Sequence, residues 1–182
     1  VKPDMVTMAK GVASGYAAIA CLVTTEEVFN QFKDDATDPL NFFRDISTFG
    51  GCTAGPAAAL ENMRIIEDEN LLDNTLAMGA RMMGNLQALS EKHAVIGDVR
   101  GKGLFLGAEL VSDRKSREPV NEKMAAAVVA DCMAQGTIIG MTNRSLPGFN
   151  NTLCFSPALI ATADDIDAIT DSVDKALTKV FG

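Results

Sequence analysis

The order of apolar and polar residues predicts a strand and several helices in the first part of the chain. Residues 17–24 form a short apolar run, which is typical of a buried strand. Residues 24–27 (Thr-Thr-Glu-Glu) then resemble a helix start, because carboxylates in the first turn are favoured by the helix dipole. Residues 33–46 are polar and contain Asp-Pro, so they are predicted to form a loop.

Two amphipathic helices are predicted next. Pro56 stands where a first-turn proline is tolerated, and Leu60, Met63 and Ile66 then recur with a period of about 3.6 residues. The second helix is expected from about residue 71 to residue 90. Apolar stripes of this kind usually face a core rather than a ligand.

After His93 the pattern changes to short apolar runs separated by glycines. Gly136 is predicted to end a helix, and the Asn-, Gly- and Pro-rich segment 143–151 is predicted to be a loop between strands. The patterns predict strands at 95–99, 104–111, 137–142 and 152–156, and a helix over about 120–135.

The last segment has the clearest helical signal. Thr162 can cap a helix, with Asp164 and Asp165 in its first turn, and apolar residues line one face from there to Val180. The whole pattern predicts an α/β chain. Residues 1–92 are expected to form one domain and residues 93–182 a small α+β C-terminal domain.

Composition narrows the function classes. The 182 residues are 47% hydrophobic, enough for a real core, and the net charge of −8 without any Lys/Arg run argues against nucleic-acid binding. No apolar run reaches about 18 residues, so no membrane partner is expected, and no signal peptide is recognised. The four cysteines form no CxxC pair and are not densely spaced, and the chain has a single histidine. This pattern favours a cytoplasmic protein without a metal site.

Two short segments could carry chemistry. Lys10 ends the apolar stretch Val6–Ala9 and precedes Gly11, so its amine is expected to be partly desolvated, which favours the neutral, nucleophilic form. Residues 47–51 (Ser-Thr-Phe-Gly-Gly) offer hydroxyls and backbone N–H groups to an anion, near the start of a predicted helix. Either segment by itself is a weak signal, because solvated lysines and hydroxyl–glycine turns are common.

The order of four motifs is more specific. The chain contains Pro-Asp-Met-Val-Thr-Met-Ala-Lys-Gly at 3–11, Ser-Thr-Phe-Gly-Gly at 47–51, Val-Arg-Gly-Lys-Gly-Leu at 99–104 and Ser-Pro-Ala-Leu at 156–159. In this order and spacing they resemble class III aminotransferases of the omega-amino-acid and amine:pyruvate type. The resemblance extends over essentially all 182 residues. It implies the C-terminal portion of a fold-type-I enzyme: the end of the cofactor-binding large domain (1–92) and a small C-terminal domain (93–182).

The resemblance also implies site residues. Lys10 matches the lysine that forms the Schiff base with pyridoxal 5′-phosphate (PLP) and then moves the proton between substrate and cofactor carbons. Thr48 matches the threonine that reaches the cofactor phosphate of the neighbouring subunit, with Phe49 beside it. A homodimer with a shared active site is therefore implied. The motif at 99–104 is interpreted as a structural turn.

Departures from the family pattern bear on the substrate. Asp45-Ile46 stands where a histidine often precedes the threonine motif, and Cys52-Thr53 stands where Asn-Pro often follows it. Cys154 occupies the position of the arginine that binds an α-carboxylate in ornithine-type members. Omega-transaminases place a mobile arginine in about the loop that holds Arg144, so Arg144 is a candidate substrate-binding residue; the alternative is a plain surface arginine.

The predicted activity is the transfer of an amino group from an amine or omega-amino acid, possibly taurine, to a keto acid such as pyruvate. Alternatives are another PLP enzyme on this scaffold (aminomutase, racemase or decarboxylase) or a non-catalytic folding or interaction fragment. Because the sequence starts without Met, and the family's phosphate-binding, ring-stacking and ring-nitrogen residues would precede Lys10, the chain is expected to be a fragment that is catalytically incomplete alone.

Overall fold

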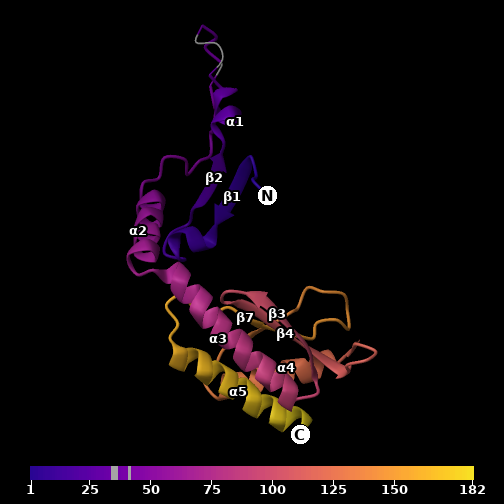
Figure 1. The fold of residues 1–182 in the computed structure, drawn as a ribbon. Coiled ribbons are helices and arrows are strands. Elements are labelled where there is room, and N and C mark those ends of the chain that lie inside the picture. The colour runs from indigo at the N-terminus through magenta and orange to yellow at the C-terminus, as the bar shows by residue number, and fades with distance from the viewer. Residues whose placement is uncertain (34–36, 41) are drawn as a thin grey trace. The chain divides into compact units, whose positions relative to one another are not determined.

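A computed structural model describes residues 1–33, 37–40 and 42–182 (Figure 1). Contacts divide the chain into two compact units, Val1–Glu69 and Asn70–Gly182. This division comes earlier than the predicted boundary after residue 92, because helix α3 (Leu71–Lys92) packs against strand β3 and helix α5 of the second unit. The assignment of residues to a large and a small domain of a longer enzyme stays a prediction.

The first unit contains a two-stranded antiparallel ribbon. Strand β1 (Met5–Ala9) pairs with β2 (Ala20–Thr24). The predicted strand is confirmed, but its predicted burial is wrong for this unit: β2 is exposed or half-buried, because β1 is its sole strand neighbour among the described residues. A short 3-10 helix, η1 (Lys10–Ala13), joins the two strands.

Two helices complete the first unit. Helix α1 (Glu26–Asn30) starts as predicted, with the Thr25 side chain capping it, and α2 covers Ala54–Asp68. The predicted apolar face of α2 is wrong for Leu60 and Met63, which are exposed, whereas Ile66 of that face is half-buried and the fully buried residues are Gly55 and Ala59. Of the predicted loop 33–46, residues 34–36 and 41 lie outside the described residues, and the rest has neither helix nor strand.

The second unit is an antiparallel sheet with helices packed on it. Its strand order is β3-β4-β7-β6, and β5 pairs with β4. The predicted strands and helices are confirmed, although the strand expected at 137–142 is only two residues long. The bounds are β3 (Ile96–Lys102), β4 (Phe105–Asp113), β5 (Glu118–Pro119), β6 (Gly140–Met141), β7 (Thr152–Phe155), α4 (Glu122–Ala134) and α5 (Ala163–Phe181).

The core of the second unit lies between one face of this sheet and the helices. Leu106, Ala108 and Leu110 of β4 are buried, whereas Phe105, which immediately precedes Leu106, is 74% exposed. This alternation follows from the two-residue period of a strand with one covered face. Figure 1 shows α3 and α5 side by side, in keeping with their direct contact. The largest fully buried side chains of this core are Phe155, Met82, Leu86, Ile96, Leu110, Leu153, Ile166 and Leu177.

Helix α3 approaches the β3–β4 turn without room for a side chain. A Cβ atom built at Gly79 would lie 2.3 Å from the backbone oxygen of Gly103. Gly103 has a φ of +54° and Gly101 a φ of +148°, values that favour glycine. The interpretation of the 99–104 motif as a structural turn is therefore confirmed, since both glycines meet backbone requirements.

Polar contacts fix α3 against α5. The Arg81 guanidinium donates to the Asp167 carboxylate, with Nε 2.8 Å from Oδ1, and the Asn85 amide donates to the same oxygen at 3.0 Å. The hydrogen bond from Arg81, aided by that from Asn85, lowers the pKa of Asp167 to about 2.

The low pKa of Asp167 predicts an acid-dependent loss of stability. Because the folded pKa (about 2) lies below the ordinary value of 3.8, the contribution of Asp167 is present above about pH 4 and is lost as pH falls toward 2. Asp167→Asn should therefore flatten the fall in free energy of unfolding over this range, measured by urea titration with circular dichroism. Asp171→Asn, on the same helix, is the matched control and should keep the wild-type slope. Parallel curves for wild type and Asp167→Asn would contradict the prediction.

Candidate functional site

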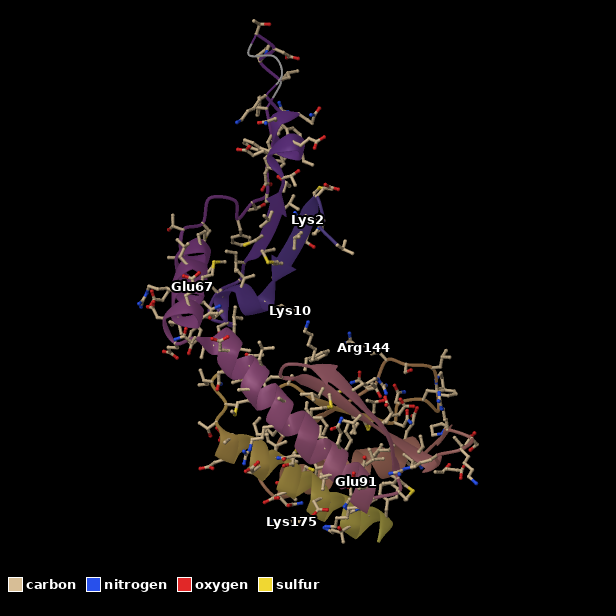
Figure 2. The ribbon with its side chains drawn as sticks, viewed as in Figure 1. Lys2, Lys10, Glu67, Glu91, Arg144 and Lys175 are labelled. Carbon is tan, nitrogen blue, oxygen red and sulfur yellow. The ribbon has the colours of Figure 1, made fainter. Side chains whose placement is uncertain are left out.

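Lys10 stands where β1 ends and η1 begins (Figure 2). Its backbone has a φ of +56°, in the left-handed region, so the chain turns sharply at this residue. The side chain is exposed and makes no hydrogen bond or ion pair with the residues that the structure describes. The desolvation expected from sequence is therefore not found within this unit, because no described side chain covers the amine. What the structure provides is an unengaged primary amine at a defined turn.

Helix α2 holds the backbone that follows Lys10. The Asn62 amide donates to the carbonyl oxygens of Gly11 (3.1 Å) and Val12 (3.0 Å). Sequence reasoning missed Asn62. The available signal was its helical spacing from Gly55 and Ala59, small residues that allow a close approach, whereas the larger apolar residues drew attention to the other face. Asn62 thus attaches the backbone that directly follows Lys10 to helix α2.

Thr48 and Phe49 lie in a tight turn before α2. The N–H of Gly50 donates to the Ser47 carbonyl at 2.8 Å, and Asp45 accepts from both the N–H and the hydroxyl of Ser47. These bonds lower the pKa of Asp45, the hydroxyl being the largest cause. The residue found in place of the family histidine therefore orders the turn.

The exposed side of this turn is free to meet another molecule. Phe49 is 88% exposed, and Thr48 is exposed as well. Within the described ranges, the backbone N–H groups of Thr48 and Phe49 have no acceptor, and neither side chain is hydrogen-bonded to Lys10. Such donors with an exposed ring suit an anion or a surface supplied from outside this unit.

Arg144 belongs to the second unit, in the loop between β6 and β7 (Figure 2). It is exposed, and its guanidinium has no hydrogen bond or ion pair to any residue in the described part of the chain. The structure thus brings Lys10, Thr48 and Phe49 into one unit and leaves Arg144 in the other. The side chains of Lys10, Thr48 and Arg144 each make no hydrogen bond or ion pair with another residue in the described ranges.

Cys154 is part of the sheet rather than of an ion-binding site. It lies on β7 opposite Gly107 and Gly140 and is half-buried. Burial raises the pKa of its thiol, so the group is neutral and cannot bind a carboxylate as an arginine would. Among the described residues, no group of His, Cys, Asp and Glu side chains could hold a metal ion. None of the described helices is both long and apolar enough to cross a bilayer.

Comparison with known proteins places these features in a family. The family model described as aminotransferase class-III matches residues 1–177. The chain is 76% identical over 181 residues to the hypotaurine/taurine–pyruvate aminotransferase of Paracoccus denitrificans, covering all of this chain and 39% of that protein. It is 66% identical to the taurine–pyruvate aminotransferase of Rhodobacter capsulatus, covering 99% of this chain and again 39% of the relative. The chain thus spans about two fifths of the length of these relatives.

Solved structures agree with this similarity. A Bacillus anthracis aminotransferase superposes with a TM-score of 0.91 at 37% identity, covering 98% of this chain and 39% of its own. An amine transaminase from an uncultivated Pseudomonas species, solved in its PLP-bound form, gives a TM-score of 0.85 at 26% identity, with 97% and 38% covered. The predicted fold class is confirmed by these neighbours.

Proposed function

Because the chain belongs to the class-III aminotransferase family, we propose that the protein carrying it moves an amino group from an amine or omega-amino acid to a keto acid such as pyruvate. Taurine or a similar amine that bears an acidic group is the donor class we favour. The single observation that carries this proposal is the 76% identity, over the full chain, to a hypotaurine/taurine–pyruvate aminotransferase.

The residues present fit PLP as the cofactor. Lys10 supplies an exposed amine with no competing carboxylate among its described neighbours, on a backbone that Asn62 fixes. Gly11 leaves open space where a Cβ would stand, so a flat ring can come close to the backbone there. When bound, PLP supplies an electron sink next to the substrate carbon that loses its proton.

Lys10 would act twice in this scheme. Its amine would hold the cofactor covalently, and once released it would accept the proton from the substrate's amine-bearing carbon and return it at the cofactor carbon. The turn at η1 limits where that amine can reach. Orientation of this kind contributes to rate because the proton then travels between fixed positions.

Thr48, Phe49 and Arg144 are proposed to have separate binding roles. The free hydroxyl and N–H groups at Thr48 suit the cofactor phosphate of a neighbouring subunit, which makes a homodimer with shared active sites part of the proposal. Arg144 would bind the acidic group of the substrate. Unpaired thiols at all four cysteines support a reducing compartment, and we therefore propose the cytoplasm.

The test is a turnover assay on a polypeptide of the relatives' full length that contains this chain. Purified protein with added PLP should convert taurine and pyruvate into alanine, detected by mass spectrometry together with the matching aldehyde. Racemised or decarboxylated amine in place of alanine would favour another PLP enzyme on this scaffold. If neither a bound-PLP absorbance band nor any product is detected, the result would favour the alternative of a non-catalytic folding or interaction fragment.

Arg144→Ala should raise the KM for pyruvate about 10- to 100-fold while changing kcat less. The reason is the loss of a charge-assisted, two-pronged contact to a carboxylate, which contributes about 1.5–3 kcal/mol. Steady-state kinetics with pyruvate and with butanal, which lacks a carboxylate, would measure this effect. Arg117→Ala, at an exposed turn of the same unit, is the control. Equal losses with both acceptors would remove Arg144 from the substrate site.

A further inference from the structure

The loop that carries Arg144 is closed at its base. The N–H of Thr142 donates to the Thr152 carbonyl at 2.9 Å, and the N–H of Thr152 donates back to the Thr142 hydroxyl at 3.2 Å. Next to this pair, the Asn151 amide is 4% exposed and donates to the Leu110 carbonyl at 2.6 Å. Both ends of the loop are thereby attached to the sheet, so any freedom it has lies between residues 143 and 150.

The tip of the loop is bound by a carboxylate on α4. One oxygen of Glu122, Oε1, accepts from the N–H of Gly148 (2.7 Å), the side-chain amide of Asn150 (2.9 Å) and the N–H of Asn150 (3.3 Å). The three donors are neutral, and no described cation pairs with Glu122. These bonds lower the pKa of Glu122, the Gly148 N–H being the largest cause, so the group is ionised at neutral pH.

Asn150 connects Glu122 to Ser145, the residue that follows Arg144. While its amide nitrogen donates to Glu122, its Oδ1 accepts from the N–H of Ser145 at 2.9 Å. Arg144 therefore stands between two hydrogen-bonded residues, Thr142 and Ser145, and its backbone has little freedom to move. A tight turn at Pro147-Gly148, with Gly148 at a φ of +88°, presents the Gly148 N–H to Glu122.

Sequence position offers another role for Glu122. A glutamate in the first turn of a helix stabilises that helix through its dipole, and Asp164 in α5 does the same without touching a loop. That role does not require Glu122 to be half-buried with three N–H donors converging on one oxygen. The convergence is directed at the loop, not at the helix.

We propose that Glu122, acting through Asn150, is a positioning residue that fixes the backbone at Arg144 and thereby sets the preference for acidic over uncharged acceptors. The part of the inference that concerns acceptor preference rests on the proposed function. The anchoring itself concerns the chain alone, so the two parts can fail separately.

Trypsin provides a readout of anchoring that does not depend on catalysis, because cleavage after Arg144 is expected to speed up when the backbone around it opens locally. In the full-length, PLP-loaded protein, Glu122→Ala and Asn150→Ala should speed this cleavage about 10-fold, followed by mass spectrometry of the new end at Ser145. Glu122→Gln keeps an acceptor oxygen and should lie between. Cleavage after Arg81, within α3, reports global unfolding and should not change. Asp164→Ala is the matched control and should cleave like wild type.

Steady-state kinetics test whether Glu122 affects the preference for acidic over uncharged acceptors. Glu122→Ala should raise the KM for pyruvate about 5- to 10-fold, with kcat and the KM for butanal each within about twofold of wild type, and Glu122→Gln should recover most of this loss. In an Arg144→Ala background, Glu122→Ala should add nothing further, because the two act as one unit.

The outcomes separate the two claims. Unchanged cleavage after Arg144 in Glu122→Ala overturns the anchoring, whatever the kinetics. Faster cleavage with equal effects on pyruvate and butanal overturns the role in specificity and leaves the anchoring in place. Faster cleavage in Glu122→Ala, combined with a wild-type protein that transaminates no acceptor, supports the anchoring and rejects the proposed function, and with it the role in specificity.

Discussion

Lys10→Ala is expected to reduce kcat for taurine and pyruvate by at least about 10⁴-fold in the full-length protein. The amine is proposed both to hold the cofactor and to move the substrate proton, and removal of a group with two such roles removes most of the rate enhancement. Activity should be followed by alanine formation. The visible absorbance band of covalently held PLP should be lost in parallel, which is a second and independent measurement.

Two controls make this result specific. Lys2→Ala changes an exposed lysine just before β1 and should leave both activity and absorbance unchanged. Lys10→Arg keeps the positive charge but offers no nucleophilic amine, so it should be as inactive as the alanine variant. Activity above about a hundredth of wild type in Lys10→Ala would remove Lys10 from the centre of the mechanism.

Gly79→Ala is expected to destabilise the second unit by about 3 kcal/mol, although alanine is the better helix former. The added Cβ, whose position the helix backbone fixes, would lie 2.3 Å from the Gly103 oxygen, a backbone atom that cannot rotate away. To accept the methyl group, α3 would have to move off the hairpin and lose packing around Met82. Urea unfolding of the chain, followed by circular dichroism, would measure the loss as a lower midpoint.

The same helix offers a matched control. At Gly84 a Cβ would meet no atom within 4 Å, so Gly84→Ala should stabilise the unit by about 0.5–1 kcal/mol through helix propensity alone. The same glycine-to-alanine change is thus expected to lower the free energy of unfolding at residue 79 and to raise it at residue 84. If both variants shift the midpoint in the same direction, the close approach at Gly79 is not the controlling contact.

Local signals in the sequence were sufficient for most elements. Thr162 caps its helix as predicted, and the helix start predicted at residues 24–27 is found with Thr25 as its cap, because a hydroxyl before a run of carboxylates has a direct local role at a helix start. The glycine-rich motif at 99–104 also specified its hairpin. Signals of this kind act between neighbours in sequence, so they do not depend on what covers the element.

Burial was harder to predict because it depends on distant parts of the protein. Leu60 and Met63 follow a helical period but are exposed in this unit, and β2 is apolar but lies open. The division by contacts comes before α3 rather than after residue 92 for a related reason: the pattern of α3 shows that it has an apolar face, not which sheet that face will cover.

Residues of the candidate site also differ in whether the sequence alone indicates them. Lys10 and Thr48 are proposed from the order of the motifs, and Arg144 from its place in a loop where omega-transaminases have a mobile arginine. Asn62, Glu122 and Asn150 have no motif, and their importance lies in hydrogen bonds to backbone atoms. A backbone acceptor or donor leaves no trace in residue type, so such supporting residues become visible only in three dimensions.

At residue 10 the left-handed backbone makes lysine less favourable for stability than glycine, whereas the proposed chemistry requires the lysine amine. A φ of +56° costs a residue with a side chain about 1 kcal/mol, and glycine would adopt it freely. Chains selected only for stability would therefore drift toward glycine at residue 10 and lose the amine. On the proposed role of Lys10, its reactivity outweighs this cost, and in a collection of natural variants the identity of residue 10 is expected to separate transaminating proteins from folded but inactive ones.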